Sequence, residues 1–550
     1  MCFLLLVGCA GDLDAGAGYG FPDAGASSDA GFVGCLSSNE CPAGYTCSEF
    51  GRCELLPQEG DAGVPPPPEV EYDFGAPISS QRYVYVAMTA EDSLARIDGT
   101  TLGVRSTKVG ESPRDVATIP GTDGAVVLDS FNGTATIVRP QGETDSIRVL
   151  GTLQRLNRLD IDPSGRFAVI WFDLVKALSE GNITNVGSFQ DVTVIALAPG
   201  SEKAVNLTVG FRPREVEFDA AGNRAYVITE DGVSVIDLAY ATEHEPSIVP
   251  PIPVVDASVP ASDVEVDIVA TGEYAAVRQA GRAALRIVNV GTLPGLGFDI
   301  PLASEPTDID LAPDGARVYA VEREAKQLAI IDVPGDAQNP AGVETIDLTN
   351  ATLGSLALSK DGTRGLLYTN ASSDERVTLV KLDEPGYPTL TWPLKKSVRA
   401  VGISPAGDTA LILNSKAFGD PSQATDFDDY IDKSYGYTLL DLATGFGKLQ
   451  ITPVDPGAFR YAPDGSKVYV ALDGGDAVNA TRAVQVVTTQ TGVVETKQLG
   501  SPPSTVGILP GAAQAFVSQR HPLGRVSFVD LTTDAVRTVT GFDLNGQVVQ

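Results

Sequence analysis

Apolar, mostly β-branched residues recur in short runs along residues 81–550, and turn-forming residues separate the runs. In the segment 306–321, polar and apolar positions alternate up to Leu311, Pro313-Asp314-Gly315 follows, and a second apolar run ends at Val321. Segments 213–228 and 459–471 repeat this pattern, and a further apolar run comes after each of the three. Alternation predicts strands, and Asp-Gly predicts a tight turn, because Asp bonds its own backbone and Gly takes positive φ. Each unit therefore predicts strand A, a turn, strand B, a loop, strand C, a turn and strand D.

The strand A pattern recurs near Asp115, Arg158, Glu215, Glu265, Asp308, Ser355, Ala400, Ala458 and Thr505. A tenth unit begins at 83–87 and 94–98 without a recognisable strand A, and we expect the other end of the chain to complete it, with 547–550 as the candidate. A spacing of about 40–57 residues is typical of four-stranded propeller blades. The chain is thus predicted to be all-β, a β-propeller of about ten units over 81–550. One large ring, a ring of seven or eight blades with extra strands, and two rings all remain open.

These repeats resemble the YVTN-type propeller repeat of bacterial and archaeal surface proteins, which is related in shape to lactonase-like propellers. The resemblance implies the fold and leaves the activity open, because propellers host many functions.

All six cysteines lie in the first 53 residues. Leu6-Val7-Gly8-Cys9 resembles a bacterial lipobox, so residues 1–9 are interpreted as the remnant of a lipoprotein signal, with lipidation at Cys9 and the true start upstream; a chance apolar terminus is the alternative. Residues 10–34 repeat Asp-Ala-Gly and are expected to form a disordered tether, similar to those of myxobacterial lipoproteins. The resemblance implies a protein secreted across the inner membrane and lipid-anchored at the outer membrane or cell surface.

Cys35, Cys41, Cys47 and Cys53 are evenly spaced in residues 35–53, which resemble a small Cys-rich module of such lipoproteins. The spacing does not fit zinc, so two disulfides are expected; three connectivities are open, of which 35–47 with 41–53 is favoured. Residues 54–80 form a Pro-rich linker.

The excess of acidic over basic residues excludes two classes of partner. With 71 acidic and 39 basic residues, the net charge is −32, which argues against nucleic acid and against adhesion to anionic lipid through protein charge. No transmembrane helix is predicted, so membrane contact is expected only through the lipid anchor.

Long loops point to one face of the ring. Residues 171–190 and 414–435 are inserted between strands B and C, and variable loops on a rigid scaffold usually carry binding. Asp426, Asp428, Asp429 and Asp432 in the second insertion could hold Ca²⁺, although the EF-hand pattern is absent; a solvated acidic loop is the alternative.

Carboxylates also recur two positions apart on strand A, which places them on one face of the strand. They are Glu215 and Glu217, Glu265 and Asp267, and Asp308 and Asp310, with Asp160 in a matching position. They could form a cation or basic-ligand site near the ring axis, and hydrogen bonding between blades is the alternative.

No catalytic residue can be assigned, because the two histidines stand in no triad pattern and no nucleophile elbow occurs near them. We therefore expect a binding or protein-interaction scaffold of the cell envelope whose ligand is an unknown protein, glycan or small molecule. A hydrolase or lactonase-like enzyme that uses the acidic residues, and a purely structural envelope protein, are the alternatives.

Overall fold

A computed structural model describes residues 69, 78–111, 113, 115–142, 144–180, 188–351, 353–474 and 480–542, and the backbone of 45–47, 53–55 and 546–548. The chain divides into two compact units, Met1–Pro66 and Pro67–Gln550. In the first unit, β1 (Tyr45–Cys47) pairs with β2 (Cys53–Leu55), so that the backbones of Cys47 and Cys53 lie opposite each other. Cys9, Cys35 and Cys41 lie outside the described residues.

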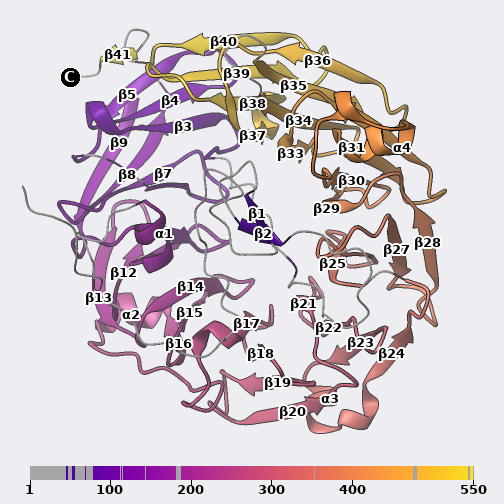
Figure 1. Ribbon diagram of the computed structural model, residues 1–550. Coiled ribbons are helices and arrows are strands. Elements are labelled where there is room, and N and C mark those ends of the chain that lie inside the picture. The colour runs from indigo at the N-terminus through magenta and orange to yellow at the C-terminus, as the bar shows by residue number, and fades with distance from the viewer. Residues whose placement is uncertain are drawn as a thin grey trace, which may run out of the picture. The chain divides into compact units, whose positions relative to one another are not determined.

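The second unit is a ring of ten sheets, or blades, which are antiparallel except for one parallel pair in blade 1 (Figure 1). This confirms the predicted all-β propeller, and of the three arrangements left open by the sequence it shows the single large ring. In blades 2 to 10, strand A is innermost (Figure 1). These strands are β6 (Asp115–Thr118), β10 (Arg158–Ile161), β14 (Pro213–Phe218), β17 (Val264–Ile268), β21 (Asp308–Leu311), β25 (Ser355–Leu358), β29 (Val398–Ile403), β33 (Pro456–Tyr461) and β37 (Pro503–Leu509). All nine predicted strand A positions are therefore confirmed.

Strands B and C form the middle of each blade, and both of their faces pack against neighbouring blades. Strand B is β3 (Tyr83–Met88), β7 (Ala125–Asp129), β11 (Phe167–Trp171), β15 (Arg224–Thr229), β18 (Tyr274–Gln279), β22 (Arg317–Glu322), β26 (Arg364–Tyr368), β30 (Thr409–Asn414), β34 (Lys467–Gly474) and β38 (Gln514–Gln519). Strand C is β4 (Ser93–Asp98), β8 (Thr134–Gln141), β12 (Asp191–Ala196), β16 (Gly232–Asp237), β19 (Ala284–Asn289), β23 (Gln327–Asp332), β27 (Arg376–Lys381), β31 (Tyr435–Asp441), β35 (Thr481–Thr488) and β39 (Arg525–Asp530). Burial on both faces explains why these strands are nearly continuous apolar runs.

Strand D lies at the outer rim and is more exposed. It is β5 (Val104–Lys108), β9 (Thr144–Gly151), β13 (Lys203–Thr208), β20 (Gly297–Pro301), β24 (Glu344–Asp347), β28 (Thr389–Pro393), β32 (Gly447–Thr452), β36 (Val494–Gln498) and β40 (Val536–Thr540). Blade 4 departs from the predicted unit, since its sheet has three strands and a single bridge, Val233 to Ile252, stands at the place of strand D. The helix α2 (Leu238–His244) and a Pro-rich connection replace the outer strand there.

Blade 1 corrects the prediction for the end of the chain. β41 (Gly546–Val548) does join blade 1, but it pairs in parallel with β5 at the outer edge and does not fill the place of strand A. Residues 78–80 lie at that place and make one bridge, Ser79 to Val84. The sequence did not reveal this because residues 78–80 are too few to show the alternation that marks the other A strands.

The core consists of ten apolar clusters, one at each junction between neighbouring blades. Ring closure is visible in the cluster that joins Val84 and Ala95 of blade 1 to Leu509 and Phe516 of blade 10. The remaining elements are α1 (Leu174–Ser179), α3 (Gly335–Gln338), α4 (Phe427–Asp432) and the 3₁₀ turns η2 (Thr89–Glu91), η3 (Ala261–Asp263), η4 (Pro340–Gly342), η5 (Pro421–Gln423) and η6 (Pro510–Ala512). In the described part of the chain, no helix combines the length and the apolar character that a bilayer crossing requires.

Candidate functional site

The two faces of the ring differ in their loops. A–B and C–D turns form one face, here the A–B face, and B–C and D–A loops form the other, the B–C face. Both predicted insertions lie on the B–C face: α1 follows β11 of blade 3, and η5 and α4 follow β30 of blade 8. Four blades lie between them in either direction around a ring of ten, so the insertions stand on opposite sides of the ring (Figure 1).

The insertion of blade 8 presents aromatic side chains to solvent. Phe427 is 75% exposed, and its ring stacks on that of Tyr430 with centroids 6.5 Å apart. Phe418, earlier in the same insertion, is also exposed. Contiguous exposed apolar side chains on a soluble domain usually mark an interaction site.

A buried lysine holds this insertion on the ring. Lys396 is 1% exposed, and its ammonium group donates hydrogen bonds to the carbonyl oxygens of Ile431 (2.6 Å) and Asp432 (2.9 Å) at the end of α4. Burial lowers the pKa of Lys396 to about 8, although the charges of Asp432 and Glu375 act in the opposite direction. The position of α4 is thus fixed by a buried charge.

The predicted acidic residues of this loop serve the helix. Asp426 caps α4 by accepting a hydrogen bond from the Asp429 N–H (2.9 Å), and Asp429 pairs with Lys433 at 2.9 Å. Asp428 is exposed and Asp432 is partly exposed. Within the described ranges, no group of three or more His, Cys, Asp or Glu side chains is arranged to hold a metal ion. The Ca²⁺ site at 426–432 stays an untested prediction.

The insertion of blade 3 is built in a similar way. Asp173 caps α1 by accepting from the Lys176 N–H, and the Lys176 ammonium group donates to the carbonyl oxygen of Asn157 (2.8 Å). Val175 and Leu178 are exposed on this short helix. The two opposite insertions therefore both present apolar side chains on the B–C face.

Several strand A carboxylates make hydrogen bonds between blades, which was the alternative to a cation site. Asp308 Oδ2 accepts from the Leu356 N–H of the next strand A (2.8 Å), and Glu217 Oε2 accepts from the Ile268 N–H (3.2 Å). Asp115, at the same position of blade 2, accepts from the Leu159 N–H at 3.0 Å. A carboxylate on one inner strand thus binds the backbone of the next.

The other predicted carboxylates have varied surroundings. Glu265 forms an ion pair with Arg278, whose guanidinium also donates to the Pro306 carbonyl oxygen (3.3 Å) of the next blade. Asp160 accepts from the Trp171 indole N–H at 2.6 Å. Glu215 is exposed. The charge of Asp267 raises the pKa of Asp310.

Two of these carboxyl groups, those of Glu217 and Asp310, have raised pKa values. Burial raises the pKa of Glu217 to about 7, and the charge of Glu215 adds to this, while the Ile268 hydrogen bond opposes it. Burial and the neighbouring carboxylates Asp308 and Asp267 raise the pKa of Asp310 well above its ordinary value. The charged form of Asp310 is therefore disfavoured in this crowded acidic cluster.

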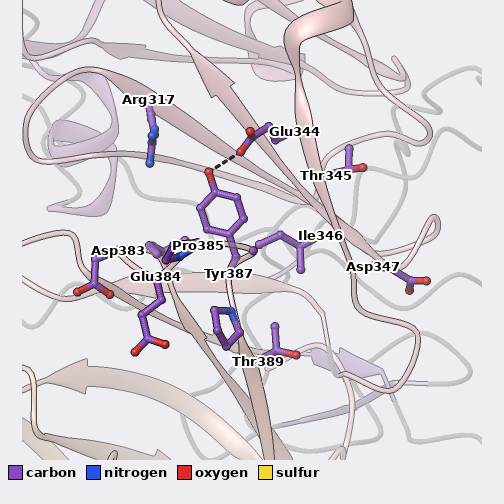
Figure 2. A pocket seen from close by; sticks show the side chains of 13 residues that line it. Arg317, Glu344, Thr345, Ile346, Asp347, Asp383, Glu384, Pro385, Tyr387 and Thr389 are labelled. Atoms are coloured by element: carbon purple, nitrogen blue, oxygen red, sulfur yellow. Dashed lines mark hydrogen bonds between the residues drawn. The ribbon is translucent and has the colours of Figure 1, made fainter.

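The sequence did not indicate a groove of about 1040 Å³ on the outer rim, between β24 of blade 6 and the C–D turn of blade 7. Figure 2 shows Tyr387 in this groove, with its hydroxyl directed toward Glu344, to which it donates a hydrogen bond. That bond, together with burial, raises the pKa of Tyr387 to about 12. Arg317 at the groove wall is already paired with Asp332 at 3.0 Å.

Sequence reasoning also missed a second hollow and a buried contact on the B–C face. The hollow, about 440 Å³, lies between blades 5 and 6 and is lined by Gly281, Ala283, Ala303, Ser304, Glu305, Glu324 and Ala325. Next to it, Arg323 forms an ion pair with Glu69 of the linker. No spacing pattern could have joined Glu69 to residues of blades 6 and 7, because such a pair depends on tertiary structure alone.

No protein-family model matches the chain, and no curated protein matches it. Among solved structures, it is similar to a dihydro-heme d1 dehydrogenase in complex with DHE, with 14% identity, a TM-score of 0.41 and coverage of 88% of this chain and 84% of that chain. A eukaryotic initiation factor matches with 10% identity, a TM-score of 0.46 and coverage of 74% and 96%. The β-propeller domain of a Myceliophteria thermophila protein, Cps50 (Swd1), matches with 12% identity, a TM-score of 0.33 and coverage of 62% and 96%. These similarities concern the fold alone and say nothing about activity.

Proposed function

We propose that this chain is a binding scaffold whose B–C face docks a protein partner. The observation that carries the proposal is the exposed Phe427–Tyr430 stack, held on the ring by the buried Lys396. Aromatic side chains on a fixed support are the usual centres of protein interfaces, because they bury much area for little loss of side-chain freedom. The apolar side chains of α1, on the opposite side of the same face, would give a large partner a second contact.

The charge of the face defines the partner further. Asp426 and Asp428 are exposed beside the aromatic stack, and the whole chain carries a net charge of −32. A partner with basic side chains around an apolar anchor is complementary to this surface. Its association should be steered by charge and should weaken as salt screens the attraction.

We further propose that the scaffold works at the cell envelope, attached through lipid on Cys9. The lipobox-like Leu6–Cys9 sequence and the Asp-Ala-Gly stretch support this, and both lie outside the described residues. Metabolic labelling with an alkyne fatty acid in the source cells should mark the wild-type protein and leave a Cys9→Ser variant unmarked.

The docking proposal is tested by comparing variants on opposite faces of one blade. Phe427→Ala/Tyr430→Ala removes the stack, whereas Phe446→Ala removes an equally exposed aromatic from the C–D turn of blade 8 on the A–B face. Proteins cross-linked to the wild type in source-cell envelopes should be retained by Phe446→Ala and reduced at least about tenfold in the double variant, as expected for a central aromatic anchor. Equal retention by both variants would exclude the Phe427–Tyr430 stack as the anchor.

A hydrolase is the alternative, and the raised pKa values of Glu217 and Asp310 favour it, because catalytic acids often have such values. Hydrolysis of lactone or aryl-ester substrates that disappears in Glu217→Gln or Asp310→Asn, with the fold intact, would support an enzyme. Activity unchanged in both variants would place any reaction elsewhere.

A further inference from the structure

A buried carboxylate from the linker lies between two blades on the B–C face. The Glu69 carboxylate accepts hydrogen bonds from the Arg323 guanidinium, from the Thr369 hydroxyl (2.6 Å to Oε1) and from the Asn370 N–H (2.8 Å to Oε2). Its side chain is 7% exposed, and that of Arg323 is 20% exposed. Both carboxylate oxygens are thus bound by donors from B–C loops of two different blades.

The ring itself orients these donors. Arg323 donates through Nε to the Leu353 carbonyl oxygen (2.9 Å), which leaves Nη2 for the carboxylate. The Thr369 hydroxyl oxygen accepts from the Ala371 N–H (3.2 Å), so its proton points to Glu69. These contacts belong to blades 6 and 7 and do not involve the linker, so the donors are placed before a carboxylate arrives.

Gly354 provides the space for the ligand. A Cβ at this position would lie 2.0 Å from Oε1 of Glu69, although the backbone of Gly354 does not have the positive φ that favours glycine. The Thr307 hydroxyl holds the Gly354 carbonyl oxygen at 2.7 Å, which keeps this wall of the site in place. A side chain at this position would thus collide with the carboxylate first, and it would also lie 2.9 Å from the Cβ of Thr369.

We propose that Arg323, Thr369, Asn370 and Gly354 form a preformed carboxylate-binding site and that Glu69 occupies it as an internal ligand. The site binds a carboxylate of an acidic peptide segment, and the covalently attached Glu69 competes with any such segment from outside. The hollow between blades 5 and 6 begins at Glu324, directly after Arg323, and provides room for residues next to the bound acid. This proposal is independent of the aromatic docking surface.

Removing the internal ligand should open the site to an external one. A fluorescent peptide with the sequence of residues 66–72 is titrated against full-length wild type, Glu69→Ala, and Glu69→Ala/Arg323→Ala, with binding followed by anisotropy. We expect saturable binding to Glu69→Ala, and at least about tenfold weaker binding to wild type, because a tethered competitor acts at a millimolar effective concentration. The double variant should lose binding, and so should a peptide with Gln at position 69.

The controls separate a receptor from a purely structural contact. Glu69→Ala/Arg376→Ala makes the same arginine change on an exposed side chain of the B–C face and should bind the peptide as Glu69→Ala does. If Glu69→Ala does not fold, Glu69→Gln keeps the shape and removes the charge. Equal binding to wild type and Glu69→Ala, or no binding to a folded Glu69 variant up to about 5 mM peptide, would overturn the proposal.

Discussion

The Lys396 ammonium group lies 2.6 Å from the carbonyl oxygen of Ile431, so a charge buried just before strand A supports a helix inserted between strands B and C of the same blade. The relationship joins the rigid part of the ring to the surface that we assign to partner binding. It also gives a direct way to loosen that surface without changing any exposed side chain.

Lys396→Met should release α4. The change leaves the carbonyl groups of Ile431 and Asp432 without their charged donor, and we expect a loss of about 2–3 kcal/mol in the free energy of unfolding. Hydrogen exchange in 427–434 should become faster, whereas exchange in blades 2 to 6 should not change. Lys395→Met, on an exposed neighbour, is the control and should have little effect.

The pH dependence of Lys396 provides a second readout of the same contact. Its folded pKa of about 8 lies below the ordinary value of 10.5, so the unfolded chain binds more protons between these values. The free energy of unfolding should therefore gain a contribution as pH rises through this window. Lys396→Met should lack this gain, and an identical slope in both proteins would contradict the burial of the charge.

Glu217→Gln should stabilise the ring above neutral pH. The folded pKa of about 7 exceeds the ordinary 4.5, so wild type loses stability as pH rises from 4.5 to 7, while the unfolded state ionises first. Melting temperatures at pH 8 should be higher for Glu217→Gln than for wild type, and the two should be similar at pH 4.5. Glu215→Gln, two residues away and exposed, should change the profile less.

An ion pair between blades and an ion pair within a blade should differ in their contribution to the free energy of unfolding. Arg399 pairs with Asp455 of the next blade at 2.6 Å and is mostly buried, whereas Arg376 pairs with Asp374 at 2.8 Å and is exposed. Arg399→Met should cost about 3–5 kcal/mol because it removes the paired cation from a shielded carboxylate, and Arg376→Met less than about 1 kcal/mol. Chemical denaturation of both variants tests this, and equal costs would show that Asp455 is well solvated.

Two turn glycines should respond differently to alanine. Gly315 and Gly121 both have positive φ, but a Cβ at Gly315 would lie 2.9 Å from the Cβ of Ala270 in the neighbouring blade, and a Cβ at Gly121 would meet no atom within 4 Å. Gly121→Ala should cost about 1–2 kcal/mol, from the backbone alone. Gly315→Ala should cost clearly more in the same denaturation experiment, because blades 5 and 6 must also move apart.

The positions of the strands in the ring could be predicted from the sequence, but the side-chain contacts between distant residues could not. Local chemistry, such as Pro313-Asp314-Gly315 followed by an apolar run, is repeated, so strand A could be located at every one of nine positions. Lys396 and Glu69 belong to no repeat, and their partners are about 35 and 250–300 residues away, so only the folded chain brings them together. The carboxylates of strand A were found from their spacing, but their hydrogen bonds to the next blade depend on how far the blades are rotated.

Segments from the beginning and the end of the propeller sequence both join blade 1, where the bridge at Ser79 forms one edge of the sheet and β41 forms the other. Three strands, β3, β4 and β5, lie between these two edges, and neighbouring strands are about 4.8 Å apart. The distance between the edges is therefore short enough for a flexible linker to join them. The ring then has no obligatory first or last blade, and circular permutation at any D–A connection would preserve every junction between blades. Such permutants would change the order in which blades leave the ribosome while keeping the native contacts, and would show whether the junction between blades 1 and 10 limits the rate of folding because it closes last.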